Sequence, residues 1–529
     1  MPVRFREKIQ EMLRKIRRTR IKKFYSSGKA ALLSILSAAL LILSFPQANF
    51  WILAWVGFVP LFFALENKSG GTAFLLSFLT GVVFWSGVIY WLVHVTLLGT
   101  IVLILYLALY FGIFGFVICR YRAAESFNLR IIFISSLWVL LEYVRGDLFT
   151  GFPWALLGYS QYLNLPVIQI ADITGAWGVS FIVMSVNAAV YLFLSNPLIF
   201  REKFKKSSVI VFCLALTLIY GYLTLYYKPW ETNSLLADYR ISVVQGNIPQ
   251  EFKWNEQYTG FTLRKLSALT RIAAGDEPDL IIWPEAAAPG ILGEDDWVFR
   301  DIKSLAVEIK VPLLTGAVVK DNNSYFGSAI LINRSGVISQ RYDKIHLVPF
   351  GEYIPLKETF PFLKTIVPIG DIEKGKDYTI FELMKSPNLR IPHKFAVLDC
   401  FEDVFPEIAR EFVRRGAGFL VNITNDAWYK ETSAPYQHLQ ASVFRALENR
   451  VYLARSANTG VSGFISPEGK IISLVSDKNN NNIFVEGFDT KDISSSYKIT
   501  SFYTKFGDLF VVACFLLAVY AVMQKTQIK

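Results

Sequence analysis

The sequence is poor in the residues that build disulfide frameworks and metal centres. Its 529 residues include only four cysteines and four histidines. Cys119, Cys213 and Cys514 fall inside long hydrophobic segments, so Cys400 is the lone thiol of the polar part and has no disulfide partner there. The four histidines are scattered, and we find no Gly-rich phosphate loop and no tandem repeat. We therefore predict neither a metal site nor a cofactor.

Charged residues are also scarce, at 18% of the chain, whereas 53% of the residues are hydrophobic and 15% are aromatic. This balance excludes an ordinary soluble protein of this length and predicts that part of the chain lies in a membrane. The net charge of +11 could favour nucleic-acid binding, but the surplus lies largely before the first hydrophobic segment and in the loop Phe200–Lys206. That placement is typical of a membrane-orientation signal, so we predict no nucleic-acid partner.

Eight hydrophobic segments approach the ~20 residues that cross a bilayer. They are Ala30–Phe45, Phe50–Leu65, Ala73–Val95, Leu97–Cys119, Ile131–Val144, Gly175–Leu194, Val209–Tyr227 and Phe502–Met523. We predict a basic arm over 1–29, a transmembrane domain of seven spans over 30–227, a polar domain over 228–500, and an eighth span with a short tail over 501–529. We expect a monomer in the cytoplasmic membrane, which in a double-membrane bacterium is the inner membrane.

Lys and Arg collect in the loops on one side of these spans, which the positive-inside rule assigns to the cytoplasm. These loops include the N-terminal arm, Arg120–Arg122, Arg201–Lys206 and Lys525–Lys529. Seven crossings then place the polar domain on the opposite, periplasmic side. The aromatic connection Arg145–Thr174 is too apolar for a solvated loop, so we predict that it lies on or re-enters the outer leaflet as a floor for that domain, or forms an aromatic belt at the headgroups.

The polar domain alternates strand and helix patterns, which predicts one α/β domain with a layered core. Its predicted strands are Tyr239–Gln245, Asp279–Trp283, Pro312–Val319, Ser328–Asn333, Lys394–Cys400, Gly418–Ile423, Val451–Ala457, Gly463–Ile465 and Lys470–Val475. Its predicted helices are Glu256–Ala274, Trp297–Lys310, Pro406–Arg415 and Pro435–Asn449.

Cys400 lies in the stretch KFAVLDCFEDVFPEIAR, at the end of an apolar strand and the beginning of a helix. Such a junction fixes the backbone, and the amides at the N-terminus of the helix favour a thiolate, so Cys400 is a candidate nucleophile. The alternative is a small buried hydrophobic residue. A nucleophilic thiol needs a base and a positive group: Glu285 ends the strand of LIIWPEAAAP, and Lys344 lies in RYDKIHLVPFGEYIP. Taken alone, Glu285 and Lys344 would more often form surface salt bridges.

These motifs resemble the Glu-Lys-Cys signature of the carbon-nitrogen hydrolase (nitrilase) superfamily. Together with eight spans and the motifs QGNIPQ, GFPW, NDAWYKETSAPYQHLQ and RALENRVYLARSANTGVSGFISPEG, the sequence resembles the apolipoprotein N-acyltransferase family over nearly its whole length. This resemblance implies a four-layer αββα sandwich. It also implies transfer of a fatty acyl chain from a phospholipid donor to the diacylglyceryl-cysteine of an apolipoprotein acceptor.

The resemblance also implies roles for individual residues. Glu285 corresponds to the base, Lys344 to the cation that stabilises the oxyanion, and Cys400 to the nucleophile that carries the acyl group as a thioester. Glu352 and Glu402 correspond to supporting positions of the triad.

Trp254 and Trp154 fall near aromatic positions that the family associates with substrate access. The sequence departs from the family pattern at Phe401, where the residue after the nucleophile is usually tyrosine. Either water or a neighbouring group replaces that hydroxyl, or the hydroxyl is dispensable.

The stretch ETFPFLKTIVPIG carries Phe360 and Phe362 and is too apolar for a periplasmic loop unless it contacts lipid. An acyltransferase that takes a phospholipid from a bilayer needs such a loop. The sequence leaves two alternatives, a membrane-tethered amidase whose apolar loop packs on its own domain and a transporter with a scaffold domain. Few ionisable residues interrupt the hydrophobic segments, which argues against the transporter.

Overall fold

The computed structural model describes residues 28–121, 127–195, 200–227, 239–349, 351–353, 372–383, 393–494 and 500–526. The chain divides into two compact units. The first unit comprises Met1–Leu141, Phe181–Phe212 and Cys514–Lys529, and the second comprises Glu142–Ser180 and Cys213–Ala513. The chain therefore passes between the units several times, and the boundaries of the units fall inside helices.

Among the described residues, five helices are long and apolar enough to cross a membrane. They lie within α3 (Gly70–Val88), α4 (Leu97–Arg120), α5 (Phe127–Asp147), α8 (Ala176–Ser195) and α9 (Phe200–Tyr227). Each matches one of the predicted spans, so the chain is a multi-pass membrane protein with five candidate spans.

The other three predicted spans correspond to shorter apolar helices, Gly28–Leu43, Trp51–Ala64 and Leu509–Gln524. The second of these begins as a 3₁₀ helix, Trp51–Trp55, before α2 (Val59–Ala64). The predicted segment Phe502–Met523 is not one helix, because Gly507 adopts a φ of 61° between α15 (Phe502–Phe506) and α16 (Leu509–Thr526). The third predicted segment was also too long, since α3 ends at Val88.

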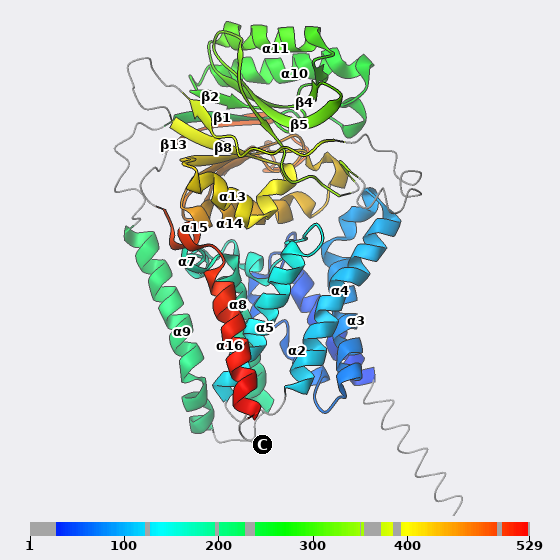
Figure 1. Cartoon of the computed structure of the whole chain (residues 1–529), viewed down its shortest axis with the longest axis vertical. Helices are drawn as coiled ribbons and strands as arrows, with labels where there is room; N and C mark the ends of the chain where they lie inside the picture. Colours follow the sequence, from blue (N-terminus) through cyan, green and yellow to red (C-terminus); the bar gives the residue numbers. More distant parts are fainter. Residues whose placement is uncertain are drawn as a thin grey trace, which may run out of the picture. The chain divides into compact units, whose positions relative to one another are not determined.

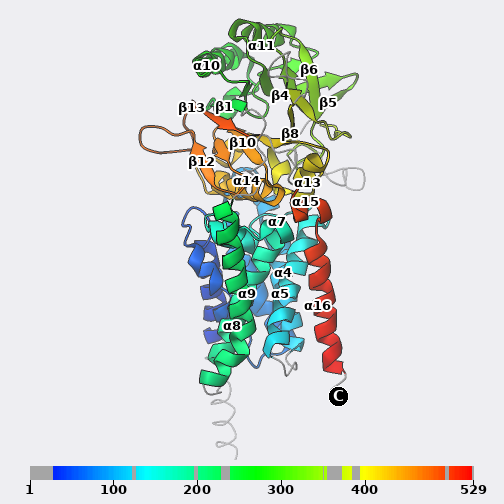
Figure 2. The ribbon, with the colours of Figure 1, turned by 90° about the vertical axis from the view of Figure 1, so that its left-hand side faces the viewer.

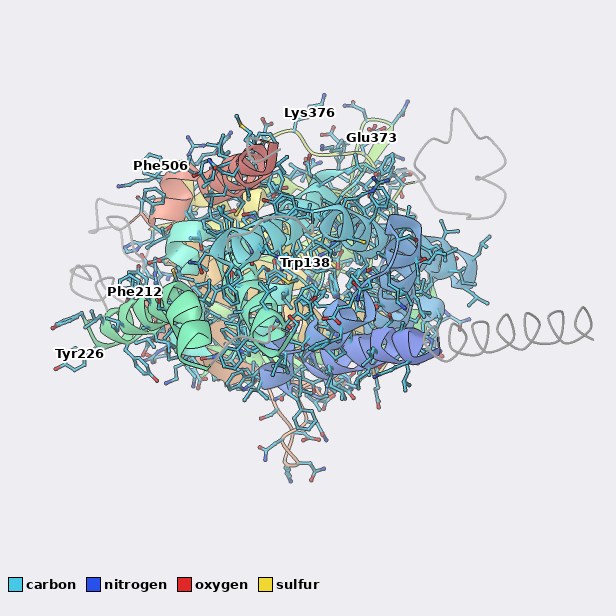
Figure 3. The ribbon with its side chains drawn as sticks, turned by 90° about the horizontal axis from the view of Figure 1, so that it is seen from below. Trp138, Phe212, Tyr226, Glu373, Lys376 and Phe506 are labelled. Carbon is cyan, nitrogen blue, oxygen red and sulfur yellow. The ribbon has the colours of Figure 1, made fainter. Side chains whose placement is uncertain are left out.

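Aromatic packing holds the interior of the first unit. Trp138 of α5 lies edge-on to Phe58, Phe111 and Phe114, with ring centroids 4.7, 5.0 and 5.1 Å away, and Figure 3 shows Trp138 among the helices. Uncharged polar groups add hydrogen bonds between helices: the Asn187 side chain accepts one from the Phe58 N–H at 2.8 Å. The interior is thus built mainly from ring contacts rather than charge.

The second unit contains two β-sheets. Within the described residues, the first sheet has the order β13 (Gly487–Ile493), β1 (Tyr239–Gln245), β2 (Leu280–Ile282), β4 (Leu313–Asp321), β5 (Ser324–Ile332) and β6 (Ile338–Asp343), with β3 (Ile291–Leu292) paired to β4. The second has the order β12 (Ile471–Leu474), β11 (Gly463–Ile465), β10 (Tyr452–Ala457), β9 (Phe419–Thr424), β8 (His393–Asp399) and β7 (Phe381–Leu383).

Helices cover the outer faces of the two sheets. Helices α10 (Glu256–Ala274) and α11 (Asp296–Ile309) lie over the first sheet, and α13 (Pro406–Arg414) and α14 (Ala434–Asn449) lie over the second (Figures 1 and 2). The inner faces meet: the Ser456 hydroxyl of β10 donates to the carbonyls of Val244 and Ile282 at 2.9 and 3.1 Å. This is the four-layer αββα sandwich that the resemblance implied. Every predicted strand and helix is present; β1, β11 and α10 have the predicted bounds, and the others have shifted ends.

The connection Arg145–Thr174 belongs to the second unit, where it forms short helical turns, including α6 (Leu165–Ile168) and α7 (Ala171–Thr174). Its polar groups pair with the sandwich. Arg450 binds Asp172 at 2.8 Å, and the Gln169 side chain donates to the Glu468 carbonyl at 2.9 Å. This segment is therefore bonded to the sandwich domain as well as being apolar.

Candidate active site

Cys400 directly follows β8 and begins a short 3₁₀ helix, Cys400–Val404. Its φ of 53° is left-handed, a conformation that non-glycine residues seldom adopt and that the surrounding structure must hold in place. The Thr424 hydroxyl, at the end of β9, donates to the Cys400 Sγ at 3.2 Å. The strand therefore delivers the thiol into a sharp turn, as the sequence pattern predicted.

The surroundings of the Cys400 thiol favour its protonated form. Burial raises its pKa well above the ordinary value, the nearby charge of Glu285 raises it further, and the charge of Lys344 acts in the opposite direction. This desolvation acts against the effect that the sequence pattern predicts for the helix amides. A neighbouring base must take the thiol proton before Cys400 can attack.

Lys344 directly follows β6 and lies between two carboxylates. Its Nζ is 2.7 Å from the Glu352 Oε1 and 3.5 Å from the Glu285 Oε1, and its side chain is 1% exposed. Burial lowers the pKa of the ammonium, but Glu352 and Glu285 overcome this effect and raise the pKa well above its ordinary value. Lys344 is therefore a buried, permanent positive charge and not a surface salt bridge.

Glu352 and Glu402 connect this charge to the backbone around it. The second carboxylate oxygen of Glu352 accepts the Val348 N–H at 2.7 Å. The fully buried Glu402 accepts the N–H groups of Ile345 and Asp399 at 2.7 and 2.8 Å. Glu402 therefore joins the segment after Lys344 to the residue before Cys400.

Lys253 is a site residue that the sequence reasoning missed. It is 5% exposed, and its Nζ donates to the Glu285 carbonyl oxygen at 2.7 Å. Burial lowers the pKa of Lys253 to about 8, while the charges of Glu285 and Cys400 act to raise it. The sequence signal that could have pointed to Lys253 was its place in QEFKW, next to Trp254. A lysine before a tryptophan is too common a pattern to identify a site residue.

The two tryptophans occupy different environments. Trp154 is 3% exposed, its ring stacks at 6.3 Å on Phe401, and its Nε1 donates to the Gln437 side chain at 2.8 Å. Its buried position contradicts the prediction of an aromatic belt for this residue. Trp254 is 53% exposed. The apolar stretch with Phe360 and Phe362 lies outside the described residues.

This arrangement suits acyl transfer. Glu285, Lys344 and Cys400 each follow a strand end, and their charges act on one another. A thiol, a carboxylate and a buried ammonium are the groups needed to attack a carbonyl and to stabilise the oxyanion that forms. The Phe401 side chain contributes no hydroxyl, and an aromatic face of Trp154 packs against it instead.

Two family models match this chain. The family model for the apolipoprotein N-acyltransferase N-terminal domain matches residues 37–189, and the carbon-nitrogen hydrolase model matches residues 240–495. Among solved structures, an amidase from Nesterenkonia sp. aligns with 53% of this chain and 97% of its own, at 17% identity and a TM-score of 0.38.

Curated relatives cover nearly the whole chain. The apolipoprotein N-acyltransferase of Geobacter metallireducens is 38% identical over 91% of this chain and 92% of its own length. Those of Pasteurella multocida and Chlorobaculum tepidum are 31% and 30% identical over 83% and 94% of this chain, and over 86% and 97% of their own lengths. The chain therefore belongs to the apolipoprotein N-acyltransferase family.

Proposed function

We propose that this acyltransferase moves a fatty acyl chain from a membrane phospholipid to the α-amino group of the diacylglyceryl-cysteine of a bacterial lipoprotein, as the final step of lipoprotein maturation. The observation that carries the proposal is the buried Cys400 thiol beside the charges of Glu285 and Lys344. Family membership supports the two substrates.

In the first half-reaction, the Cys400 thiol passes its proton to Glu285 as the sulfur attacks the ester carbonyl of the phospholipid. The carbonyl oxygen becomes an oxyanion, which the Lys344 ammonium stabilises. Collapse of this intermediate breaks the ester C–O bond, the lysophospholipid oxygen takes the proton from Glu285, and the acyl group stays on Cys400 as a thioester.

In the second half-reaction, the lipoprotein α-amine attacks the thioester carbonyl and Glu285 takes a proton from the amine. The C–S bond breaks, and the Cys400 sulfur recovers a proton from Glu285. An α-amine with an ordinary pKa near ~8 is partly neutral near pH 7, so it needs little help. Because both substrates use one thiol in turn, the kinetics should be ping-pong.

The remaining site residues take supporting roles in this proposal. Glu352 orients Lys344, and Glu402 holds the Cys400 turn against the segment that follows Lys344. Trp154 and Trp254 line the route of the substrates, and Phe360 and Phe362 meet the lipid.

We propose the predicted topology for the same protein: eight spans, with domain boundaries near residues 29, 227 and 500, and a periplasmic catalytic domain. The distribution of Lys and Arg between the loops supports it. Topology-reporter fusions at Asn322 and at Lys529 should lie on opposite sides of the membrane. If both fusions report the same side of the membrane, this topology is wrong.

The test of the reaction is the acyl-enzyme itself. Purified protein in detergent is mixed with a synthetic diacylphospholipid that carries radiolabelled acyl chains, without an acceptor. A hydroxylamine-labile acyl adduct should accumulate on the peptide that contains Cys400, with lysophospholipid released in about equal amount. The Cys400→Ala variant should carry none. Absence of the adduct, together with intersecting double-reciprocal lines, would mean that transfer is direct.

A further inference from the structure

The backbone carbonyl of Cys400 accepts a hydrogen bond from one side chain and lies close to a second, each from a different element. The Asn422 Nδ2, on β9, donates to this oxygen at 3.1 Å, and the His438 Nε2, on α14, lies 3.3 Å from it. Asn422 also donates to the Leu398 carbonyl at 3.0 Å. The Asn422 amide therefore anchors the Cys400 carbonyl oxygen, which faces His438 of α14.

Arg455 sets the orientation of the Asn422 amide. Asn422 lies between Leu398 of β8 and Arg455 of β10 in the sheet register. The Arg455 guanidinium donates to the Asn422 Oδ1 at 2.6 Å. Because a guanidinium can only donate, it fixes the oxygen of the amide on its own side and turns the NH₂ group toward Cys400.

Two aspartates lock the two cations in place. Asp403 accepts from the His438 Nε2 at 2.7 Å and from Arg455 at 3.0 Å. Asp426 lies 3.0 Å from the His438 Nδ1 and 3.3 Å from Arg455. All four side chains are at most 2% exposed.

These four side chains, Asp403, Asp426, His438 and Arg455, form a quartet of charges whose sum is zero. Burial lowers the pKa of His438, but the two aspartates overcome it and raise the pKa to about 9. Burial alone would raise the pKa of each aspartate, yet His438 and Arg455 hold both below the ordinary value. Two carboxylates therefore face an imidazolium and a guanidinium, and both imidazole nitrogens can donate.

Anchoring the carbonyl also orients the opposite edge of the same peptide. A peptide unit is planar, so the N–H of Phe401 points away from the Cys400 carbonyl oxygen. Phe401 lies in the first turn of the 3₁₀ helix, where an N–H has no partner within the helix. This N–H is thus available to the oxyanion that forms when Cys400 attacks.

We infer that Asn422, fixed by Arg455 and supported by His438, Asp403 and Asp426, is a positioning residue that holds the peptide between Cys400 and Phe401 in its left-handed turn and aims its N–H at the oxyanion. The inference rests on the proposed nucleophile role of Cys400. Buried ion pairs often stabilise a fold less than apolar residues of the same volume would. A requirement for geometry at the nucleophile explains why four charges are buried here.

The experiment compares two reactions of the same thiol in the full-length protein in detergent. Acylation by the labelled phospholipid forms an oxyanion, whereas alkylation by iodoacetamide displaces iodide and forms none. Both rates are read in single turnovers on the peptide that contains Cys400. The variant is Asn422→Ala. The matched control is Asn449→Ala, since Asn449 is equally buried and hydrogen-bonded but contacts Arg445 and Thr504 instead.

Asn422→Ala should lower the ratio of acylation to alkylation by about tenfold to a hundredfold, because a misaimed donor costs acylation alone. Asn449→Ala should leave the ratio at the wild-type value. An unchanged ratio in Asn422→Ala, or an equal fall in the control, would overturn the inference.

Ser442→Ala is the second variant, should Asn422→Ala fail to fold. Ser442 donates to Asp403 and accepts from Arg455 at 2.9 Å, so its loss loosens the quartet without removing a charge. A severalfold fall in the ratio supports the inference and an unchanged ratio overturns it. If wild-type protein forms no adduct on Cys400, the proposed function itself is wrong. An adduct that forms at the wild-type rate in the variants contradicts only the positioning inference.

Discussion

Both compact units bury apolar side chains, but among the described residues buried charges belong to the second unit. In the first unit, Trp138 (Figure 3) and the phenylalanine rings around it make up the interior, and exposed apolar residues such as Leu98 and Phe212 lie on its helices. In the second unit, Lys344 and Glu402 are at most 1% exposed. The interior of the first unit is therefore held by apolar contacts. The second unit also contains buried charges, whose positions their partners fix.

This difference shows where geometry matters. Moving a charge from water into the interior costs several kcal/mol, and only well-placed partners of opposite charge and hydrogen bonds offset this cost. A ring packed against other rings makes many weak contacts, and no single angle among them is critical. Substitutions in the second unit should therefore change the rate of acyl transfer, whereas substitutions in the first should change stability and leave the chemistry alone.

The largest expected effect is that of Lys344→Met, which removes the charge proposed to stabilise the oxyanion. Methionine has a similar length, so phospholipid binding should remain close to normal. Acylation of Cys400 should slow by roughly two to three powers of ten, the usual loss for one such donor. Lysophospholipid release in single turnovers measures the rate. An unchanged rate would contradict the expectation that buried charges of the second unit control acyl transfer, because Lys344 would then have no catalytic role.

Glu402→Gln should have a smaller effect. Its carboxylate accepts the N–H groups of Asp399 and Ile345 and the Tyr342 hydroxyl, whereas glutamine has one acceptor oxygen. At least one buried donor then loses its partner, at about 1–3 kcal/mol. We expect acylation to fall about tenfold and the midpoint of thermal unfolding to drop.

The control for Glu402→Gln is Glu411→Gln, which changes a partly exposed carboxylate on α13 that pairs with Arg415. This variant should resemble the wild type in both measurements. If the two variants behave alike, Glu402 has no special part in holding the Cys400 turn.

Sequence patterns pointed to two members of the triad because these share a local signal. Glu285 and Cys400 lie at or just after the ends of apolar runs, which can be recognised without the fold. Lys344 follows β6, whose sequence ISQRYD carries no such run, so its role came from the resemblance to the family. The strands that were missed lack that signal. β13 has the sequence GFDTKDI and is joined to β1 through its backbone, so no apolar pattern marks it.

The residues around the triad could not be predicted, because their roles depend on contacts distant in the sequence. His438 and Asp403 are 35 residues apart and belong to different helices. Lys253 meets the Glu285 carbonyl across 32 residues. The raised pKa of Cys400 is a third example, since desolvation depends on everything that surrounds the thiol.

Trp138→Ala tests the apolar interior of the first unit. The substitution removes a ring that contacts Phe58, Phe111 and Phe114, which typically costs about 3 kcal/mol or more in a packed interior. The midpoint of thermal unfolding in detergent should fall clearly. The single-turnover acylation rate, counted per folded molecule, should stay at the wild-type value. A large fall in that rate would show that packing in the first unit controls the chemistry of the second.

Lys253→Met tests a pH dependence of stability rather than a loss of activity. Burial lowers the pKa of Lys253 to about 8 in the folded protein, against 10.5 for the unperturbed group. Below about pH 8 both the folded and the unfolded chain carry the proton, so the folded state bears the full cost of burying the charge. Between the two values only the unfolded chain binds the proton. Stability therefore rises with pH across this window, by about 3 kcal/mol from this group.

Unfolding midpoints of the wild type and the variant in detergent, compared from about pH 7 to about pH 10, test this sign. Wild-type protein should gain stability relative to Lys253→Met as the pH rises. Lys265→Met is the control, because Lys265 pairs with the exposed Glu486 on the surface and its loss should leave the difference flat. If Lys253→Met and the wild type keep a constant difference across the window, the ammonium is not desolvated. The contrast between charged and apolar interiors would then weaken at the catalytic centre itself, since Lys253 contacts the backbone of Glu285.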